Sequence, residues 1–420
     1  RQDGALPEDA PPLGDGIETD LTEYGFSLLR AALALREQTG SSDTTRRAFE
    51  RAARAFEALT TNDDPESPEK GFLRVLAAAA YHLASYSAIA YSLLRPLENT
   101  NVNPAEQALS LLILRDLRGL RVMTREFLLA DEHRDEAFAG MLDDDESDTE
   151  EALSIILNAT VCRALAFFDF ALQTGDAGLI ERAATLLTIG QRLAADAGAV
   201  SLWWIVRLCR SFIDDLWEHS LHSRLPLEPP QGAEQTYPGL RERFVISLYA
   251  RKTSEVELWP SQLEAAARST DVEDDLVVAL PTSAGKTRIA ELATLMTLAQ
   301  DSRVLIVTPL RALSAQTERS FRNTFGPLGF SVSSLYGASG VSESDEDALR
   351  SKNIVIATPE KLDFALRNDP NIIDDVGLIV LDEGHMIGPT EREIRYETLV
   401  QRLLRRADSA NRRIICLSAI

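Results

Sequence analysis

The sequence predicts two regions of different fold class, an all-α region followed by an α/β region built on a parallel sheet. Apolar residues recur at helical spacing from Leu21 to Leu221, which indicates helices that each bury one face. Beyond Asp275, short apolar runs alternate with helical segments, and this alternation is typical of parallel sheets covered by helices. We therefore expect a helical domain at residues 21–223, a linker at 224–239 and an α/β domain at 240–420.

The helical domain is expected to consist of helical hairpins. Its longer periodic stretches are Gly71–Leu94, Ala105–Leu129, Glu150–Leu172, Leu179–Ala195 and Leu202–Leu221. Ala48–Leu59 has a faint tetratricopeptide pattern, but no fixed period runs through the region, so a true solenoid remains an alternative only. Residues 1–20 are acidic and rich in Pro, and we expect them to be disordered or extended.

Three other features of this region have ordinary structural explanations. The acidic run Asp143–Glu151 favours a solvated loop over a binding tail. His219 and His222 could share a helical face, but no acid–cysteine constellation accompanies them, so surface or capping histidines are favoured over a metal site. Trp203 and Trp204 are better explained as core anchors than as a platform for base stacking.

In the α/β region, short apolar runs predict the strands. They are Leu276–Leu280, Val304–Thr308, Val332–Leu335, Ile354–Thr358, Leu378–Asp382 and Ile414–Ser418. Ligands of parallel α/β sheets bind beyond the carboxyl ends of the strands. The residues that directly follow these runs are therefore the candidates for a functional site.

The first run is followed by a loop of small residues and then by a helical segment. Backbone N–H groups and the helix dipole at such a helix N-terminus favour phosphate oxygens, a lysine there adds a point charge, and a threonine hydroxyl can ligate Mg²⁺. A bare Gly-Lys-Thr is also compatible with an exposed loop lysine, but its position between strand and helix favours a nucleotide site. The predicted phosphate-binding residues are Thr282, Ser283, Ala284, Gly285, Lys286 and Thr287.

A second strand supplies the acidic groups that such a site needs. Leu378–Asp382 is followed by Glu383, Gly384 and His385. One carboxylate can join the Mg²⁺ shell while the next lies against the attacking water, which is the division of labour that phosphoryl transfer requires. The two strand ends together predict a nucleoside-triphosphate site.

Other strand ends carry further polar and Pro-containing segments. They are Thr308-Pro309-Leu310-Arg311, Thr358-Pro359-Glu360-Lys361 and Leu417-Ser418-Ala419-Ile420, with Leu258-Trp259-Pro260-Ser261-Gln262 upstream of the first strand. The order, spacing and residue identities of all these segments resemble those of the first RecA-like motor domain of superfamily 2 helicases, DExH-box branch. Pro-Thr-Ser-Ala-Gly-Lys-Thr and Pro-Leu-Arg-Ala-Leu are most similar to the Ski-type group, which includes superkiller RNA helicases and archaeal repair helicases. The resemblance covers roughly Leu258–Ile420.

This resemblance implies a RecA-like P-loop NTPase fold for the α/β domain, with ATP and Mg²⁺ as cofactors. Gln262 would contact the adenine edge, with Trp259 or Pro260 packing nearby. Asp382 would organise the Mg²⁺ shell together with Thr287. Glu383 would orient or deprotonate the hydrolytic water.

The resemblance also implies coupling residues and a nucleic-acid track. His385, Ser418 and Ala419 would link the nucleotide state to a neighbouring motor lobe. The track for single-stranded or duplex nucleic acid would bind phosphates through backbone N–H groups and hydroxyls, which makes it sequence-tolerant. Each Thr-Pro pair is also explained by strand termination, since a residue before Pro prefers extended geometry, but two such ends in this order favour the track. The implied track residues are Pro309, Arg311, Thr358 and Pro359.

Several departures from the family pattern bear on activity. Leu280 stands where a small residue usually opens the loop, Gly384 is an unusual third letter in Asp-Glu-x-His, and Ile420 replaces the usual Thr after Ser-Ala. No Gln-x-x-Gly-Arg-x-Gly-Arg cluster, which would supply arginine fingers, is present. Because a finger is worth about a thousandfold in rate, we expect a fragment without the second RecA-like lobe to bind ATP weakly and to hydrolyse it poorly.

Composition narrows the class of protein. A net charge of -22 argues against a non-specific polyanion binder that works through bulk charge. No apolar run is expected to span a membrane, and the acidic N-terminus is unlike a signal peptide. Cys162, Cys209 and Cys416 lie in apolar runs, which favours reduced core residues of a cytoplasmic protein.

Three functions remain open on these grounds. The first is an ATP-dependent helicase whose helical domain recruits partners or regulates the motor. The second is a non-hydrolysing scaffold that retains the RecA-like domain for binding alone. The third rests on resemblance alone: Ski-type helicases with an extra N-terminal helical domain are similar to the motor subunits of antiphage systems, which implies a helical domain that docks a protein such as a nuclease.

Overall fold

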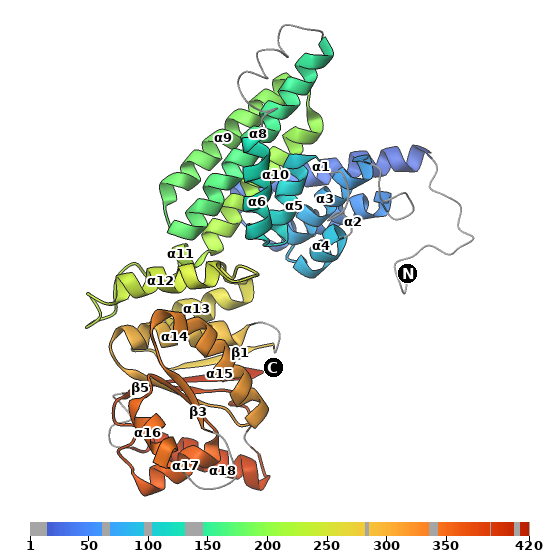
Figure 1. Ribbon diagram of the computed structural model, residues 1–420. Helices are drawn as coiled ribbons and strands as arrows, with labels where there is room; N and C mark the ends of the chain where they lie inside the picture. The colour runs from blue at the N-terminus through green and yellow to red at the C-terminus, as the bar shows by residue number, and fades with distance from the viewer. Residues whose placement is uncertain are drawn as a thin grey trace. The chain divides into compact units, whose positions relative to one another are not determined.

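The computed structural model describes residues 15–60, 68–95, 103–130, 146–281, 285–335, 343–386, 388–406 and 412–419. The chain divides into two compact units, Arg1–Asp215 with Lys252–Ser254 and Leu216–Arg251 with Glu255–Ile420. Over its described residues the first unit is helical, whereas the second contains a parallel sheet with helices (Figure 1). The predicted fold class, a helical-hairpin domain followed by a parallel-sheet RecA-like domain, is confirmed.

The helical unit is built from neighbouring helices that pack on one another in chain order. Pairs such as α1 with α2, α2 with α3 and α8 with α9 are in contact, and aromatic side chains, among them Phe49, Phe56, Phe168 and Phe212, are fully buried. The helices are α1 (Asp15–Thr39), α2 (Asp43–Thr60), α3 (Pro68–Leu83), α4 (Ser87–Leu94), α5 (Pro104–Ile113), α6 (Leu117–Leu129), α8 (Glu146–Thr174), α9 (Ala177–Asp196) and α10 (Val200–His219).

Two of the long predicted helices are each divided in two. The prediction for Gly71–Leu94 is wrong at Ser85, which has a φ of 70°, and the prediction for Ala105–Leu129 is wrong at Arg115, which has a φ of 60°. A left-handed residue ends an α-helix. The hydrophobic period continues on both sides of each break, so periodicity alone could not reveal it.

The N-terminal and acidic segments also differ from expectation. Within residues 1–20, α1 begins at Asp15, so the last part of the predicted extended segment is helical, while residues 1–14 lie outside the described part. Likewise Glu146–Glu151, predicted to be loop, begins α8, because acidic residues are favourable in the first turns of a helix.

One described helical stretch, Glu150–Thr174 in α8, is long and apolar enough by length and composition to cross a membrane, with a mean hydropathy of 1.7. Of the most apolar 18-residue window of this stretch, 56% is buried within the protein. α8 contacts α5, α6 and α9. A core helix that is apolar on most sides passes the same test, and the packing of α8 fits that explanation.

The segment that we expected to be a linker is packed instead. Within residues 224–239, Leu225 is 2% and Ala233 is 1% exposed, and both belong to the core of the second unit. The Tyr237 hydroxyl donates a hydrogen bond to the Pro226 carbonyl at 2.8 Å. Pro- and Gly-rich composition therefore marks an irregular but buried segment here, between α11 (Leu221–Arg224) and α12 (Tyr237–Tyr249).

The sheet of the second unit has the strand order β1-β6-β5-β2-β4-β3, and every neighbouring pair is parallel. Each strand overlaps a predicted apolar run. The strands are β1 (Leu276–Leu280), β2 (Arg303–Val307), β3 (Val332–Leu335), β4 (Ile354–Ala357), β5 (Val376–Leu381) and β6 (Arg413–Ala419).

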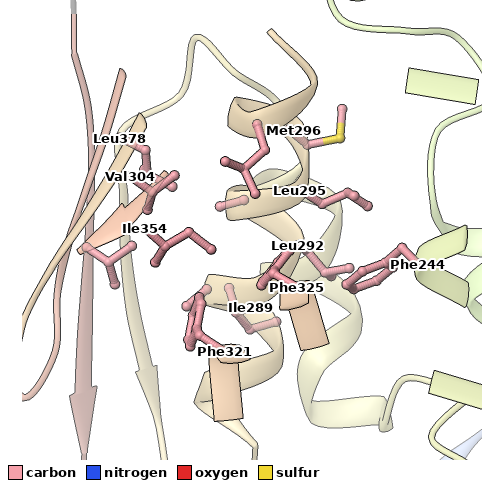
Figure 2. Close-up of a cluster of buried hydrophobic side chains, with 14 of the residues drawn as sticks. Phe244, Ile289, Leu292, Leu295, Met296, Val304, Phe321, Phe325, Ile354 and Leu378 are labelled. Carbon is pink, nitrogen blue, oxygen red and sulfur yellow. The ribbon is translucent and has the colours of Figure 1, made fainter. Parts of the chain in front are cut away.

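Helices cover both faces of this sheet (Figure 1). One face packs against α12, α14 and α15 and the other against α17 and α18, so each face has its own apolar core. In Figure 2, Phe244 of α12 lies near Leu292 of α14 and Phe325 of α15, and the same cluster includes Val304 and Leu378 of the sheet. The remaining elements are η3 (Pro260–Gln262), α13 (Leu263–Ser269), α14 (Lys286–Ala299), α15 (Arg311–Phe325), η4 (Gly326–Leu328), α16 (Glu343–Ser351), α17 (Pro359–Asn368) and α18 (Glu391–Leu404).

Candidate functional site

The junction between β1 and α14 forms the first part of the site. Gly285 caps the N-terminus of α14 with a φ of 73°, in the left-handed region that favours glycine. A Cβ atom at this position would also collide with the Gln262 side-chain amide. Glycine is therefore needed both for the turn and for the close approach. Thr282, Ser283 and Ala284 lie outside the described residues.

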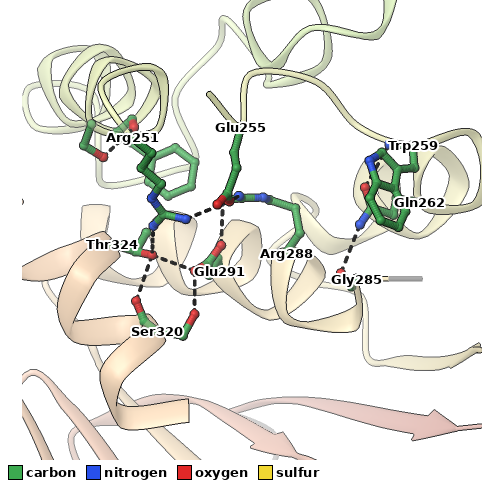
Figure 3. Close-up of polar contacts among 11 residues, drawn as sticks. Arg251, Glu255, Trp259, Gln262, Gly285, Arg288, Glu291, Ser320 and Thr324 are labelled. Atoms are coloured by element: carbon green, nitrogen blue, oxygen red, sulfur yellow. Dashed lines mark hydrogen bonds and ion pairs between the residues drawn. The ribbon is translucent and has the colours of Figure 1, made fainter. Parts of the chain in front are cut away.

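Gln262 is fixed beside this junction. Its side chain is 4% exposed, its Nε2 donates to the Gly285 carbonyl at 3.0 Å, and its Oε1 accepts from the Trp259 N–H at 2.9 Å. Trp259 itself remains 53% exposed. Figure 3 shows the Trp259 ring and the anchored Gln262 amide side by side, with the amide bonded to Gly285.

Lys286 connects the β1–α14 junction with the turn after β5. The lysine is 7% exposed, and its Nζ lies 3.5 Å from Glu383 Oε1. The ammonium group therefore meets an acidic side chain that comes from a different strand end. Thr287, by contrast, is exposed on the first turn of α14.

The acidic turn after β5 is held in a strained conformation. Glu383 has a φ of 50°, in a region that costs free energy for a residue with a side chain. The Glu383 N–H donates to Asp382 Oδ1 at 3.0 Å, and the Asp382 N–H donates to the Val307 carbonyl at 2.9 Å. Burial, and next the charge of Glu383, raise the pKa of Asp382, while its backbone hydrogen bond and Lys286 oppose that rise.

The proposed coupling residues lie next to these groups. His385 Nδ1 lies 3.4 Å from Glu383 Oε2, and the histidine side chain is 45% exposed. Ser418 and Ala419 are on β6, where they pair with Ala279 and Leu280 at the end of β1. Strands β1, β6 and β5 thus bring their carboxyl ends together around the acidic turn. Ile420 lies outside the described residues.

The two Thr-Pro segments lie side by side, because β2 and β4 are neighbours and the Thr308 N–H donates to the Ala357 carbonyl at 3.0 Å. Pro309, Thr358 and Pro359 are buried, with Thr358 4% exposed. No side chain caps the N-terminus of α15 or α17. The two helix starts, more than the buried side chains, are therefore the polar groups that these segments place at the strand ends. The side chain of Arg311 lies outside the described residues.

A buried polar network, which sequence reasoning missed, anchors this region. Arg288 Nη1 donates to Glu291 Oε2 at 2.6 Å, and Thr324 Oγ1 donates to Glu291 Oε1 at 2.6 Å. Arg288 also pairs with Glu255, and Arg251 donates to Glu255 and Thr324 (Figure 3). The network fixes the chain that leads to Trp259 onto α14 and α15. The signal was an Arg–Glu pair three residues apart inside an apolar helix.

The side chains around the acidic turn are potential ligands for a metal ion. Among the residues that the structure describes, no group of three or more His, Cys, Asp or Glu side chains could hold one. Mg²⁺ usually needs only one or two carboxylates, with phosphate and water as its other ligands. The raised pKa of Asp382 indicates a carboxylate that a nearby cation would stabilise. The acidic turn therefore fits Mg²⁺ bound together with a phosphate group.

Comparisons with known proteins agree with this geometry. A family model described as DEAD/DEAH box helicase matches residues 259–419. These residues form a DEAD/DEAH box helicase domain. The helicase domain includes the β1–α14 junction, the acidic turn, both Thr-Pro segments and β6. The narrower assignment to the Ski-type group stays a proposal.

Individual relatives differ in how much of the chain they match. Hachiman protein HamB from Bacillus cereus is 24% identical over 98% of this chain and 35% of its own length. ATP-dependent DNA helicase Hel308 from Pyrococcus abyssi (strain GE5 / Orsay) is 37% identical over 39% of this chain and 22% of its own length. Among solved structures, DUF1998 helicase MrfA aligns with a TM-score of 0.37 and 25% identity, over 42% of this chain and 29% of that chain.

The chain therefore spans about a third of the length of HamB and less than a quarter of that of Hel308. The similarity to Hel308 covers an extent close to that of the helicase domain. The similarity to HamB extends over nearly the whole chain and so includes the helical unit.

Proposed function

We propose that this chain is the ATP-binding part of a nucleic-acid motor, an ATP-dependent helicase or translocase of the DExH-box superfamily 2 type and of its Ski-type group. One observation carries the proposal: Lys286 of α14 and Glu383 after β5 meet at 3.5 Å beside the N-terminus of α14. A triphosphate bound there would replace the ion pair, taking the ammonium group as its counter-charge and freeing Glu383.

Each residue of the site has a distinct part in this proposal. Gly285 and the first N–H groups of α14 bind phosphate oxygens, and Lys286 neutralises their charge. Gln262 reads the adenine edge, and the exposed Trp259 covers the base. Glu383 orients the attacking water and accepts its proton.

Asp382 and Thr287 are the residues that would hold Mg²⁺, which when bound screens the negative charge of the phosphates. Asp382 lies next to the buried backbone of β2 and β5, so its carboxylate has a fixed position. His385, Ser418 and Ala419 would transmit the nucleotide state to a second RecA-like lobe, which in this class of motor also supplies arginine side chains.

The nucleic-acid contact is proposed for the helix starts after β2 and β4. The segments 308–311 and 358–361 lie side by side, and their helices begin without side-chain caps. Uncapped helix N-termini bind phosphate oxygens without regard to base identity. A nucleic-acid strand bound at these helix starts would lie along the carboxyl edge of the sheet, where the nucleotide is also proposed to bind, because β2 is a neighbour of β5.

The experiment that tests this function is ATP turnover by the full protein, with and without single strands and duplexes of DNA and RNA. We expect stimulation by at least one nucleic acid, and we expect Glu383→Gln to retain ATP binding while it stalls turnover. Glu397→Gln, an exposed carboxyl on α18, is the matched control and should turn over normally. If Glu383→Gln turned over normally as well, the assignment of Glu383 as the water-orienting group would be wrong. A full protein that binds ATP but does not turn it over would instead favour the non-hydrolysing scaffold.

A second function is favoured by the similarity to HamB, which extends over the helical unit as well as the helicase domain. We propose that the motor belongs to an antiphage complex and that the helical unit docks a protein partner such as a nuclease. Hosts that carry the gene and its neighbours should then resist phage, and Lys286→Ala should remove the resistance. A neighbouring gene product should co-purify with the full protein. Equal plaque counts with and without the gene, or a monodisperse protein without a partner, would count against this function.

A further inference from the structure

Gly384, the third residue of the acidic turn, is a glycine for reasons of space. Its φ is not positive, unlike that of Gly285, so its backbone conformation is open to any residue. A Cβ atom built on Gly384 would, however, overlap the Sγ atom of Cys416, well inside the closest approach that real Cβ atoms show. It would lie at an ordinary 3.7 Å from the Cβ atom of Cys416. The thiol sulfur alone therefore occupies the space that a side chain at position 384 would need.

Cys416 has little freedom to give way. It lies in the middle of β6, where its Cα pairs with Val277 of β1 on one side and Leu381 of β5 on the other. It also packs against the apolar core that includes Tyr396 and Leu399 of α18. Cys416 is partly buried, and close packing on its buried side limits where the sulfur can move.

The contact lies directly behind the strained residue of the site. The Gly384 N–H donates to the Leu417 carbonyl of β6 at 2.8 Å, and the Met386 N–H donates to the Glu383 carbonyl at 3.0 Å. The first bond holds the turn against β6, and the second closes the turn itself, while Glu383 keeps its left-handed conformation. If the turn moved away from β6, the Gly384 bond would break and Glu383 would relax to an ordinary conformation.

We propose that Gly384 and Cys416 are a pair of positioning residues: the absent side chain of one and the thiol of the other let the acidic turn lie flat on β6 and thereby set the position of the Glu383 carboxylate. This inference rests on the proposed ATPase function. The pair also connects Glu383 with Ser418 and Ala419, which follow Cys416 on the same strand. Neither residue of the pair touches the substrate.

The test is a double-mutant cycle in the full protein. Gly384→Ala should lower kcat for ATP by about a hundredfold, because a displacement of about 1 Å in a catalytic group has that effect. The Kd for ATP should change less than about threefold, since the β1–α14 junction is untouched. Cys416→Ala removes the sulfur, and in the Gly384→Ala background it should restore kcat by roughly tenfold or more. Cys416→Ser in that background should restore less, because its oxygen still fills part of the space.

The matched control is Gly326→Ala, where the added Cβ would meet its nearest neighbour at 3.9 Å and turnover should be normal. A wild-type kcat for Gly384→Ala, an equal loss of ATP affinity and kcat, or a double variant as slow as Gly384→Ala would each overturn the proposal. If Gly384→Ala does not accumulate as folded protein, a folded and active double variant supports the pair, and an unfolded one overturns it. Lys286→Ala distinguishes a failure of the positioning proposal from a failure of the ATPase proposal. If this variant hydrolyses ATP as fast as the wild type, the proposed ATPase function fails, and the positioning proposal fails with it.

Discussion

In the α/β unit the buried charges beside the site come in pairs, whereas in the helical unit two buried groups have pKa values that are shifted chiefly by burial. Arg288 and Glu291, with side chains 10% and 3% exposed, form an ion pair on α14. In the helical unit, burial alone raises the pKa of Glu106 to about 7, and burial together with Arg115 lowers the pKa of His82 to about 3. Paired charges fix geometry, while buried groups with shifted pKa values make stability depend on pH.

This difference implies that the stability of the α/β unit should respond to nucleotide, whereas the stability of the helical unit should respond to pH. The α/β unit places Lys286, Asp382 and Glu383 where strands end, so nucleotide binding there should stabilise that unit. The helical unit buries Glu106 and His82 within its helix packing, away from any predicted motif. Experiments that change either the nucleotide or the pH can therefore test this difference between the two units.

The largest expected effect comes from Lys286→Ala. Removing the ammonium group should lower ATP turnover by about a hundredfold or more, because phosphoryl transfer depends on fixed positive charge. The nucleotide-induced rise in the melting temperature of the α/β unit should disappear as well. Lys252→Ala, an exposed lysine, serves as the control for charge alone. A variant of Lys286 that keeps both turnover and the nucleotide-induced shift contradicts the division between the units.

The second effect concerns the buried network. Glu291→Ala leaves Arg288 without its partner on α14, and we expect a loss of about 3 kcal/mol in the free energy of unfolding of the α/β unit. Glu50→Ala in the helical unit removes a comparable pair with Arg54, which is 69% exposed, and should cost less than about 1 kcal/mol. Urea denaturation of both variants measures the contrast. Similar losses would show that burial does not distinguish the two pairs.

The third effect is a pH dependence in the helical unit. A carboxyl whose pKa is raised on folding binds its proton more tightly in the native state, so its stabilising effect is complete below about pH 4.5 and is lost as the pH rises through about 7. Glu106→Gln should remove a change on the order of 3 kcal/mol over that interval. The exposed Glu126→Gln is the control. Unfolding curves of Glu106→Gln that keep the wild-type pH slope would rule out Glu106 as the source.

The smallest effect is expected at Tyr396 of α18. Its hydroxyl is buried and has no hydrogen-bond partner among the residues that the structure describes, and its pKa is raised, chiefly by burial. Tyr396→Phe should leave turnover unchanged and should keep or raise stability by about 1 kcal/mol, since an unsatisfied buried polar group is removed. Thermal melts of the variant and the wild type measure this change in stability. A clear loss of stability would reveal a partner for the hydroxyl.

The sequence predicted those parts of the molecule in which local pattern and tertiary structure agree. All strands of the sheet were recognised, because short apolar runs bounded by polar residues have few alternatives. The site followed from the strands, since Lys286 and Glu383 must share the carboxyl edge of a parallel sheet. Ser85 and Arg115 were missed because a left-handed residue leaves the hydrophobic period intact on both sides.

Other features depend on register, which a single sequence does not reveal. The contact between Gly384 and Cys416 requires β5 and β6 to be neighbours at one particular alignment, and the sequence showed only that Gly384 was unusual. The packed segment around Leu225 and Ala233 was mistaken for a linker for the same reason. Pro, Gly and polar residues mark irregular backbone, but burial is decided by what packs over it.

The central claim is that one triphosphate binds between Lys286 and the acidic turn. The most direct test is a structure of the full protein with Mg²⁺ and a non-hydrolysable ATP analogue. We expect the terminal phosphates within hydrogen-bonding distance of Lys286, with the metal ion next to Asp382 and the adenine next to Gln262. An analogue bound elsewhere, with the ion pair between Lys286 and Glu383 intact, would contradict the account.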